Sequence, residues 1–446
     1  ERVRGLDTLR KALEPFGAAE VARHTGVPEE TFRAVATAVA GAENLVVVYG
    51  REAMAAGKPL LQAIGNLVLL TGHVGRPGNG VLPIMRYNNS RGALDMGVRP
   101  DKGPGYTVLA QEEGMSARQM IQAAASGRLR ALYLAGTDPV AAYPQAAAAL
   151  DKLDLLIVQD LFMTPTAERA DFVLPAASFA ERDGTFTNAE RRVQRFRQAR
   201  ENVGESRPDW QIFAAVGRAI GGLLSPSAQP VSDQRAPART KGKAIAAASS
   251  LPAARPWVYR SSDDINNEIV KTIAIYSGAS YARLRSNGGV WGRQPTSDPV
   301  FYDGTSYTNT EGYGVQWPVL AEQPKVMFDL VFSLPEPAPQ ADGKLTLVTV
   351  PRLYDDGTLM QESEVLRFWV AQPYVGLSRD DAGRLQVESG DKVRLSSASG
   401  MIELWARVDG DVPAGTALVP DLEAIPLAGV QTGLLTPVQI EKVQGA

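Results

Sequence analysis

The sequence contains no cysteine, and this absence excludes several kinds of site at once. Disulfide bonds, thiolate-bound zinc and cysteine-ligated iron–sulfur clusters all require the missing thiol group. Only two histidines are present, His24 and His73, so a metal site would have to consist of carboxylates, and no segment groups them suitably. We therefore expect no metal site formed by this chain's side chains and no electron-transfer centre within it.

An excess of basic charge and long apolar runs are also lacking. The formal net charge is −3, whereas nucleic-acid-binding proteins usually carry a basic face. The longest apolar stretch, residues 63–70, contains Gly65 and Asn66 and falls short of the ~18 residues that indicate a membrane-spanning helix. No secretory signal peptide opens the sequence. We expect no nucleic-acid partner and no direct membrane insertion.

The chain is long and starts abruptly. Its 446 residues are more than usually fold around one hydrophobic core, so we expect about two to four domains. The first residue is Glu1 rather than methionine, and helical sequence follows at once. We therefore expect a further portion upstream.

Apolar runs typical of strands alternate with helical periodicity in residues 1–223. This alternation predicts a doubly wound parallel sheet, with ligand-binding loops after the carboxyl ends of the strands. Helices are predicted in residues 6–41 (two of them), 59–71, 116–126 and before residue 150. Strands are predicted at residues 44–49, 131–135, 155–159 and 172–175.

The composition changes twice after residue 223. Residues 224–340 contain a Pro-, Ala- and Ser-rich linker and an insertion of uncertain fold, with one helix predicted at residues 264–276. Residues 341–446 show short strands separated by Gly and Asp, and their spacing predicts a compact β-barrel. The predicted barrel elements are strands at residues 345–350, 392–396, 401–407 and 416–420, with a helix at residues 378–385.

Several sequence motifs occur in an order that is specific to one family. They are LTGHVGRPGNG (residues 70–80), NNSRGALDMG (88–97), AGTDP (135–139) and a long segment from Gln159 to Arg195 that includes LPAA and GTFTNAERRVQR. On these motifs the chain resembles the molybdopterin oxidoreductase family, which includes formate dehydrogenases and the large iron–sulfur subunit of bacterial NADH–quinone oxidoreductase (respiratory complex I). The resemblance is close over about residues 40–220 and moderate over residues 345–443.

The resemblance implies an α/β fold class. Rossmann-like doubly wound parallel-sheet domains would occupy residues 1–223, and a double-psi β-barrel that binds molybdopterin dinucleotide would occupy residues 341–446. In active family members, two guanine dinucleotide pterins lie between these parts. The positions of this sequence that match the pterin-binding loops are Gly75, Arg76, Gly78, Asn88, Asn89, Thr137, Asp138, Asp160, Thr187 and Asn188.

These residue types suit a dinucleotide. Glycines such as Gly75 and Gly78 let the backbone approach a diphosphate, and Arg76 would neutralise it. Asp138 and Asp160 follow strands, where a carboxylate accepts hydrogen bonds from a ribose or a guanine. The alternative for each position is structural, because glycine and short polar residues also form turns without any ligand.

Departures from the formate dehydrogenase pattern favour a chain that has lost its catalytic groups. Met85 stands where the resemblance implies a catalytic arginine, unless the loop is shifted by one residue and Arg86 serves instead. In the loop after the first strand, residues 51–54 lack the histidine that the formate enzymes carry. Asp355 and Asp356 stand where the formate enzymes carry a Gly-His pair, and two carboxylates suit a diphosphate poorly. We therefore expect no catalytic residue and no bound cofactor in this segment.

The resulting functional expectation is a scaffold in the complex I peripheral arm, on the cytoplasmic side of the inner membrane. Its partners would be the other subunits of that arm, and iron–sulfur clusters would lie upstream in the complete subunit. One alternative is the catalytic subunit of a formate dehydrogenase-like enzyme with molybdenum or tungsten and bis-molybdopterin guanine dinucleotide. A second alternative is a stand-alone binding module.

Three other features have simple structural interpretations. His73 is expected to be a buried, hydrogen-bonded residue rather than a ligand. His24 is expected near a helix end before Gly26. The basic run at residues 191–197 favours a solvated helix face, and the less favoured reading is an anion-binding or docking surface.

Overall fold

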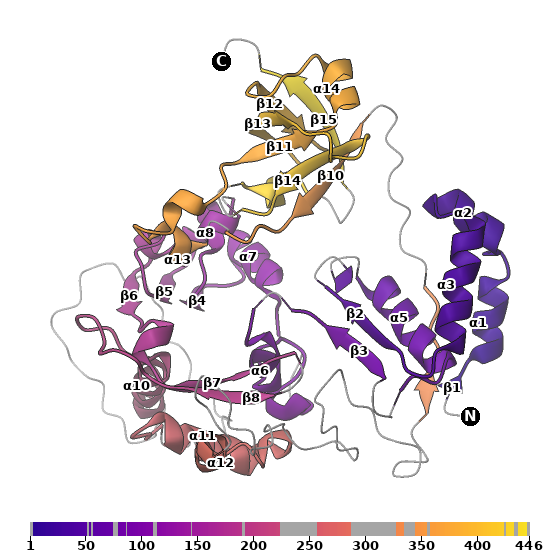
Figure 1. Cartoon of the computed structure of the whole chain (residues 1–446). Coiled ribbons are helices and arrows are strands. Elements are labelled where there is room, and N and C mark those ends of the chain that lie inside the picture. The colour runs from indigo at the N-terminus through magenta and orange to yellow at the C-terminus, as the bar shows by residue number, and fades with distance from the viewer. Residues whose placement is uncertain are drawn as a thin grey trace.

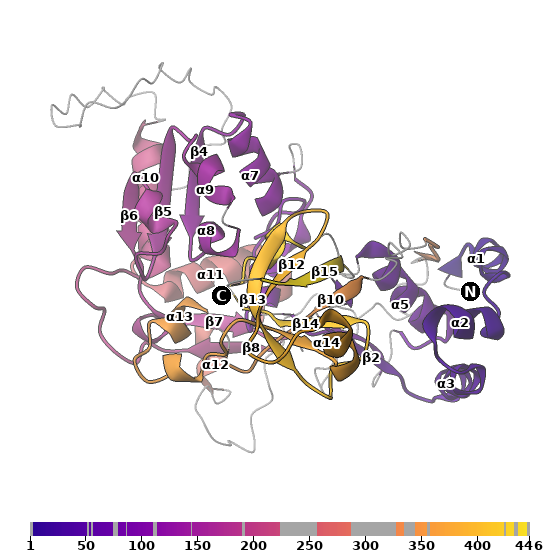
Figure 2. The same cartoon turned by 90° about the horizontal axis from the view of Figure 1, so that it is seen from above.

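We describe the protein from a computed structural model (Figures 1 and 2). The structure describes residues 3–50, 53–54, 57–74, 79–85, 87–109, 114–143, 145–189, 192–223, 257–286, 327–333, 344–354, 357–422, 425–431 and 436–443. Most of the predicted linker, residues 224–256, lies outside these ranges.

Three helices lie between β1 and β2, where the sequence predicted two. Gly17 and Gly26 flank the middle helix, and Gly26 has a left-handed φ of 72° that ends it. The elements are β1 (Val3–Arg4), α1 (Leu6–Leu13), α2 (Ala18–Thr25), α3 (Glu29–Gly41), β2 (Val46–Tyr49), α5 (Lys58–Leu70) and β3 (Gly80–Pro83). β2 and β3 pair in parallel, and β1 pairs in parallel with β9 (Phe328–Asp329).

A second parallel sheet has the order β4-β5-β6. Its central strand is buried by apolar side chains, with Leu156 and Val158 in the core. Ser116 forms a capping box with Gln119 that starts the helix before β4. The elements are α7 (Ala117–Ala125), β4 (Ala131–Ala135), α8 (Pro139–Ala142), α9 (Ala146–Leu150), β5 (Leu155–Asp160), η2 (Ala167–Arg169) and β6 (Phe172–Pro175).

The basic run predicted as a helix face is instead strand β8 of an antiparallel pair, β7 (Gly184–Thr187) with β8 (Val193–Phe196). Tyr276 and Tyr281 belong to one hydrophobic cluster with Val193 of β8. Figures 1 and 2 show α12, which begins at Tyr281, beside the pair. The remaining helices before the barrel are α6 (Ser90–Asp95), η1 (Pro104–Tyr106), η3 (Phe179–Glu181), α10 (Asp209–Leu223), α11 (Ser262–Thr272), η4 (Ala274–Tyr276) and α12 (Tyr281–Ser286).

A closed six-stranded barrel follows, in the order β10-β14-β11-β13-β12-β15. Alternate residues of its strands, such as Leu345 and Leu347, point into one apolar core. Its elements are β10 (Leu345–Val350), α13 (Thr358–Gln361), η5 (Arg367–Trp369), β11 (Tyr374–Leu377), α14 (Arg379–Leu385), β12 (Lys392–Ser396), β13 (Met401–Val408), β14 (Thr416–Pro420), η6 (Leu427–Gly429) and β15 (Thr436–Lys442). The predicted fold class, parallel α/β sheets followed by a β-barrel, is confirmed.

Among the described residues, no helix has both the length and the apolar character that a membrane-spanning helix requires.

Candidate functional site

A cavity of about 780 Å³ lies between the parallel sheet β4-β5-β6 and the barrel. The sheet side consists of the residues that follow β4 and β5, at the carboxyl ends of these two strands. Open parallel sheets generally bind ligands at this position, in the crevice outside the carboxyl ends of the strands. The barrel side comes from α13 and from the segment after β14, and Figure 1 shows α13 beside α8.

Asp138 lies on the cavity wall and is held by two donors. It is the N-cap of α8, and its Oδ1 accepts the backbone N–H of Ala141 at 3.1 Å. The hydroxyl of Thr166, which is fully buried, donates to the same oxygen. Thr137, the preceding residue, is exposed at the cavity. One wall of the cavity therefore carries the fixed carboxylate of Asp138 and the exposed hydroxyl of Thr137.

Asp160 is the last residue of β5 and also lines the cavity. Its Oδ1 accepts the backbone N–H of Leu161 at 2.7 Å. Burial raises the pKa of the Asp160 carboxyl, and the nearby charge of Asp138 raises this pKa further. Two carboxyl groups facing one cavity form an acceptor-rich wall that suits N–H and O–H donors of a ligand.

The loop before α6 supplies a third wall. Tyr87 lines the cavity and is 66% exposed, and Asn88 beside it is exposed. Asn89 is directed elsewhere, because its Oδ1 accepts the backbone N–H of Thr187 at 2.9 Å. Asn188 is also engaged internally, because its Oδ1 accepts the backbone N–H of Arg192 at 2.9 Å.

The structure thus brings together only part of the predicted set. Thr137, Asp138 and Asp160 share the cavity, whereas Asn89 and Thr187 do not line it and bind each other instead. The predicted residues Gly75, Arg76 and Gly78 lie outside the described residues, as do Asp355 and Asp356 of the barrel.

The barrel side of the cavity was missed by the sequence analysis. Thr358, Asp421 and Gln431 add polar groups there, and Leu359 and Ile425 add apolar surface. No periodicity or turn signal distinguishes these residues from other loop residues. They line the cavity only because the barrel packs against the sheet side of the chain at this point.

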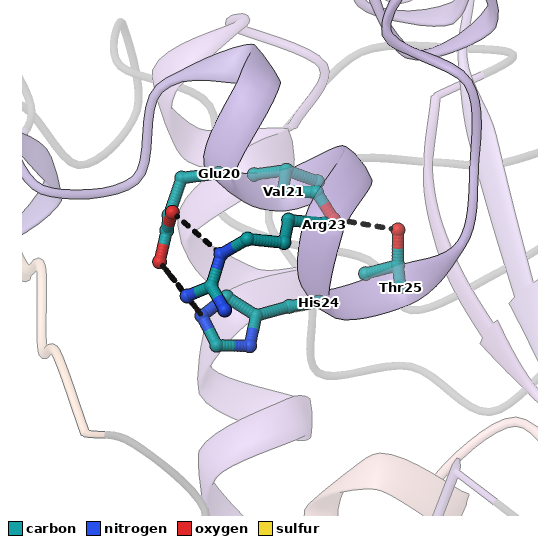
Figure 3. A network of polar contacts seen from close by, with 5 residues as sticks. All are labelled: Glu20, Val21, Arg23, His24 and Thr25. Atoms are coloured by element: carbon teal, nitrogen blue, oxygen red, sulfur yellow. Dashed lines mark hydrogen bonds and ion pairs between the residues drawn. The ribbon is translucent and has the colours of Figure 1, made fainter.

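Both histidines have structural partners. His73 is 1% exposed, and its ring nitrogens contact the Thr71 hydroxyl at 2.7 Å and the Ala42 carbonyl at 2.9 Å. The prediction of a buried, satisfied His73 is confirmed. His24 lies in the last turn of α2, where its Nε2 contacts Glu20 at 2.8 Å (Figure 3). In the described part of the chain, no group of three or more histidine, aspartate or glutamate side chains is arranged to hold a metal ion.

The predicted solvated face of the basic run is wrong for Arg195. Its side chain is 12% exposed and its guanidinium carbon lies 3.9 Å from the centroid of the Tyr281 ring. This cation–π contact packs β8 against α12. Arg191 lies outside the described residues.

Comparisons with known proteins identify the family. Residues 36–219 match the family described as Molybdopterin oxidoreductase, and residues 345–445 match the Molydopterin dinucleotide binding domain. The two matches lie on the two sides of the cavity. Residues 36–219 thus belong to the molybdopterin oxidoreductase family, and residues 345–445 to its dinucleotide-binding domain.

Several similar proteins are named formate dehydrogenases or putative formate dehydrogenases. The chain is 29% identical over 440 residues to the alpha subunit of F420-dependent formate dehydrogenase 2 from Methanococcus maripaludis, covering 93% of this chain and 59% of that protein. It is 30% identical to a putative formate dehydrogenase of Staphylococcus aureus, covering 94% of this chain and 41% of that protein. The chain therefore spans about half the length of such relatives.

A solved structure shares the fold. The acetylene hydratase of Pelobacter acetylenicus superposes with a TM-score of 0.68 over 99% of this chain and 67% of that chain. The sequence identity is 15%, so this likeness concerns the fold alone.

Two expectations from the sequence are corrected by these matches. The expectation of a complex I scaffold is wrong, because the relatives are named formate dehydrogenase subunits and oxidoreductases. The expectation of no cofactor is also wrong, because the barrel matches a domain that binds the pterin dinucleotide. Both errors came from weighting the departures at Met85 and at residues 51–54 and 355–356 above the long ordered match.

Proposed function

We propose that this chain is part of a formate dehydrogenase-like molybdenum or tungsten oxidoreductase, in which it forms much of the pocket for a bis-molybdopterin guanine dinucleotide cofactor. The cavity between the sheet and the barrel carries this proposal, since its two walls belong to the two segments that match the family and its dinucleotide-binding domain. The relatives named as formate dehydrogenases support the reaction class.

The residues at the cavity fit such a group. Asp138 and Asp160 are acceptors, and a guanine or a ribose offers N–H and O–H donors that a carboxylate binds well. Leu359 and Ile425 of the barrel side offer apolar surface to a planar ring. Thr137 adds a hydroxyl that both donates and accepts.

The division of work follows from these contacts. The bound cofactor would supply two-electron redox chemistry at its metal. The chain's own residues would bind and orient the dinucleotide. Asp138, whose carboxylate is held by Thr166, would accept hydrogen bonds from the ligand with a fixed orientation. Asp160 would accept hydrogen bonds from the ligand at the end of β5. The barrel residues would exclude water from the buried part of the ligand.

Metal and pterin analysis of the complete native protein tests the proposal. We expect one molybdenum or tungsten atom and two guanine dinucleotide pterins for each copy, measured by elemental mass spectrometry and by fluorescence of the oxidised pterin. Asp138→Ala and Asp160→Ala should each lower the pterin content. Asp154→Ala is the matched control, because Asp154 pairs with Arg130 on the surface just before β5 begins. A native protein without metal and pterin would overturn the proposal.

A further inference from the structure

A buried carboxylate lies at the end of α6, the helix that follows the cavity loop. The cavity loop is residues 87–89, of which Tyr87 lines the cavity. Asp95 is 0% exposed and receives hydrogen bonds from two tyrosine hydroxyls. Tyr106 donates to its Oδ1 at 2.5 Å, and Tyr276 donates to its Oδ2 at 3.0 Å. A buried carboxylate is stable only when such partners are in place.

Tyr276 connects α6 to a second element. Its hydroxyl also contacts the Thr187 hydroxyl at 2.7 Å, and Thr187 lies at the end of β7 with 2% exposure. The backbone N–H of Thr187 donates to Asn89 at 2.9 Å. α6 is thus tied to β7 at both ends: Asn89 binds β7 directly, and Asp95 reaches Thr187 through Tyr276.

The backbone at Tyr106 indicates that this network determines the local structure. Tyr106 has φ of 62°, a left-handed conformation that is unfavourable for a residue with a Cβ atom. Its hydroxyl donates to Asp95 and accepts from Arg91 at 3.3 Å. The contacts of the side chain offset the strain of the backbone.

Close packing leaves little freedom within the loop itself. A Cβ atom on Gly92 would lie 2.3 Å from Oδ1 of Asn89, so the Asn89 side chain fills the space above the first turn of α6. The same Oδ1 accepts the backbone N–H of Thr187 in β7 at 2.9 Å.

We propose that Tyr276 is a positioning residue that fixes the cavity loop by joining α6 to β7 through its hydroxyl group. The tyrosine belongs to the 257–286 segment, whose helix α12 packs against β8. This segment therefore determines the position of Tyr87 and Asn88 in the cavity loop, although none of its own residues lines the cavity. The effect on cofactor retention rests on the proposed function, whereas the effect on the loop does not.

Hydrogen exchange of the complete protein tests the positioning role. Tyr276→Phe keeps the ring in its apolar cluster and removes only the hydroxyl. We expect the amides of residues 87–98 to lose protection by about tenfold, the effect of one lost hydrogen bond to a buried charged group on a local opening. Thr187→Val removes the other end of the bridge but keeps its backbone N–H, and should produce the same change.

Tyr259→Phe is the matched control. Tyr259 lies in the same segment and its hydroxyl donates to Glu268 at 2.8 Å, away from α6. The control should leave residues 87–98 unchanged. Unchanged exchange in Tyr276→Phe, or an equal change in Tyr259→Phe, would overturn the positioning role.

Cofactor retention separates the two proposals. In the holoenzyme, Tyr276→Phe should increase the pterin lost during prolonged dialysis by about tenfold over wild type, in line with the loop opening. Faster exchange with unchanged retention would overturn the link between loop and cofactor. A wild-type protein without pterin would refute the proposed function, and the exchange measurement would still decide the role of Tyr276.

Discussion

Thr166 donates its hydroxyl proton to Oδ1 of Asp138 across 2.5 Å and accepts the backbone N–H of Val140 at 3.0 Å. A residue 28 positions away in sequence thereby fixes the carboxylate that caps α8 at the cavity. The buried Thr166 side chain thus fixes the orientation of the Asp138 carboxylate at the cavity wall.

Thr166→Val should lower the free energy of unfolding by about 1–3 kcal/mol, because the Val140 N–H loses its acceptor and the Asp138 carboxylate loses a donor. Urea denaturation of the pterin-free protein measures the change. Thr37→Val is the control, since Thr37 is exposed on α3, and its effect should stay within about 0.5 kcal/mol. Equal effects at both positions would contradict this account.

Asp160→Asn should raise the melting temperature of the pterin-free protein at neutral pH. Burial and Asp138 raise the pKa of Asp160 above its ordinary value of 3.8, so the folded state binds a proton more tightly than the unfolded state. This carboxyl therefore destabilises the fold as pH rises through the window above 3.8, and the amide does not. The advantage of Asn in melting temperature should be larger at neutral pH than at a pH near 3.8, because the Asp160 carboxyl is ionised only at the higher pH.

The control for this measurement is Asp154→Asn. Asp154 is half exposed and pairs with Arg130, so its replacement should give no gain in melting temperature at either pH. A gain for Asp154→Asn as large as that for Asp160→Asn would show that the effect has nothing to do with the cavity.

Gly92→Ala should cost about 1–3 kcal/mol of stability, because the new methyl group would meet Oδ1 of Asn89 at 2.3 Å and displace it from Thr187. Gly65→Ala in α5 is a control of opposite sign. No atom lies within 4 Å of its added Cβ, so it should stabilise the helix by about 0.5–1 kcal/mol. Chemical denaturation of both variants distinguishes the two outcomes.

The pKa of the Glu20 carboxyl should lie far below that of an ordinary glutamate. Its hydrogen bonds with Arg23 and His24 (Figure 3) lower its pKa from 4.5 to about 2. A lowered carboxyl pKa stabilises the fold above the ordinary value, and the contribution is lost as pH falls through about 2. NMR titration of the Glu20 side chain measures this value.

Arg23→Gln should return the pKa of Glu20 toward 4.5, because the hydrogen bond with Arg23 is its largest cause. Arg33→Gln on α3 breaks a different pair, with Glu29, and should leave the Glu20 titration unchanged. An unshifted Glu20 in the wild-type protein would show that the pair does not persist in water.

The parallel sheet was predictable from sequence because its strands are short continuous apolar runs, of which β5 contains the buried residues. The strands at Ala131–Ala135 and Phe172–Pro175 have the predicted bounds. Two barrel strands escaped prediction because turn-forming residues interrupt their patterns: β11 contains Gly376, and β15 contains Pro437. Pairing with neighbouring strands decides their conformation.

The candidate site was predictable only where a residue directly follows a strand. Asp138 and Asp160 were found in this way, because carboxyl ends of neighbouring parallel strands meet at one edge. The cavity residues of the barrel and the role of Tyr276 depend on contacts between segments far apart in the chain. Asn89 and Thr187 match family motifs, and the sequence alone does not distinguish a ligand contact from an internal one.

The strand order of the barrel also limits when it can form. β10 pairs with β14 and β15, and β12 pairs with β15, so closure waits until residues 436–442 have left the ribosome. Pairings over such sequence distances form slowly, because a long stretch of chain must be ordered before they are made. Until then the barrel cannot cover the sheet edge with Asp138 and Asp160, so the cavity between sheet and barrel is completed only after the last strand is made.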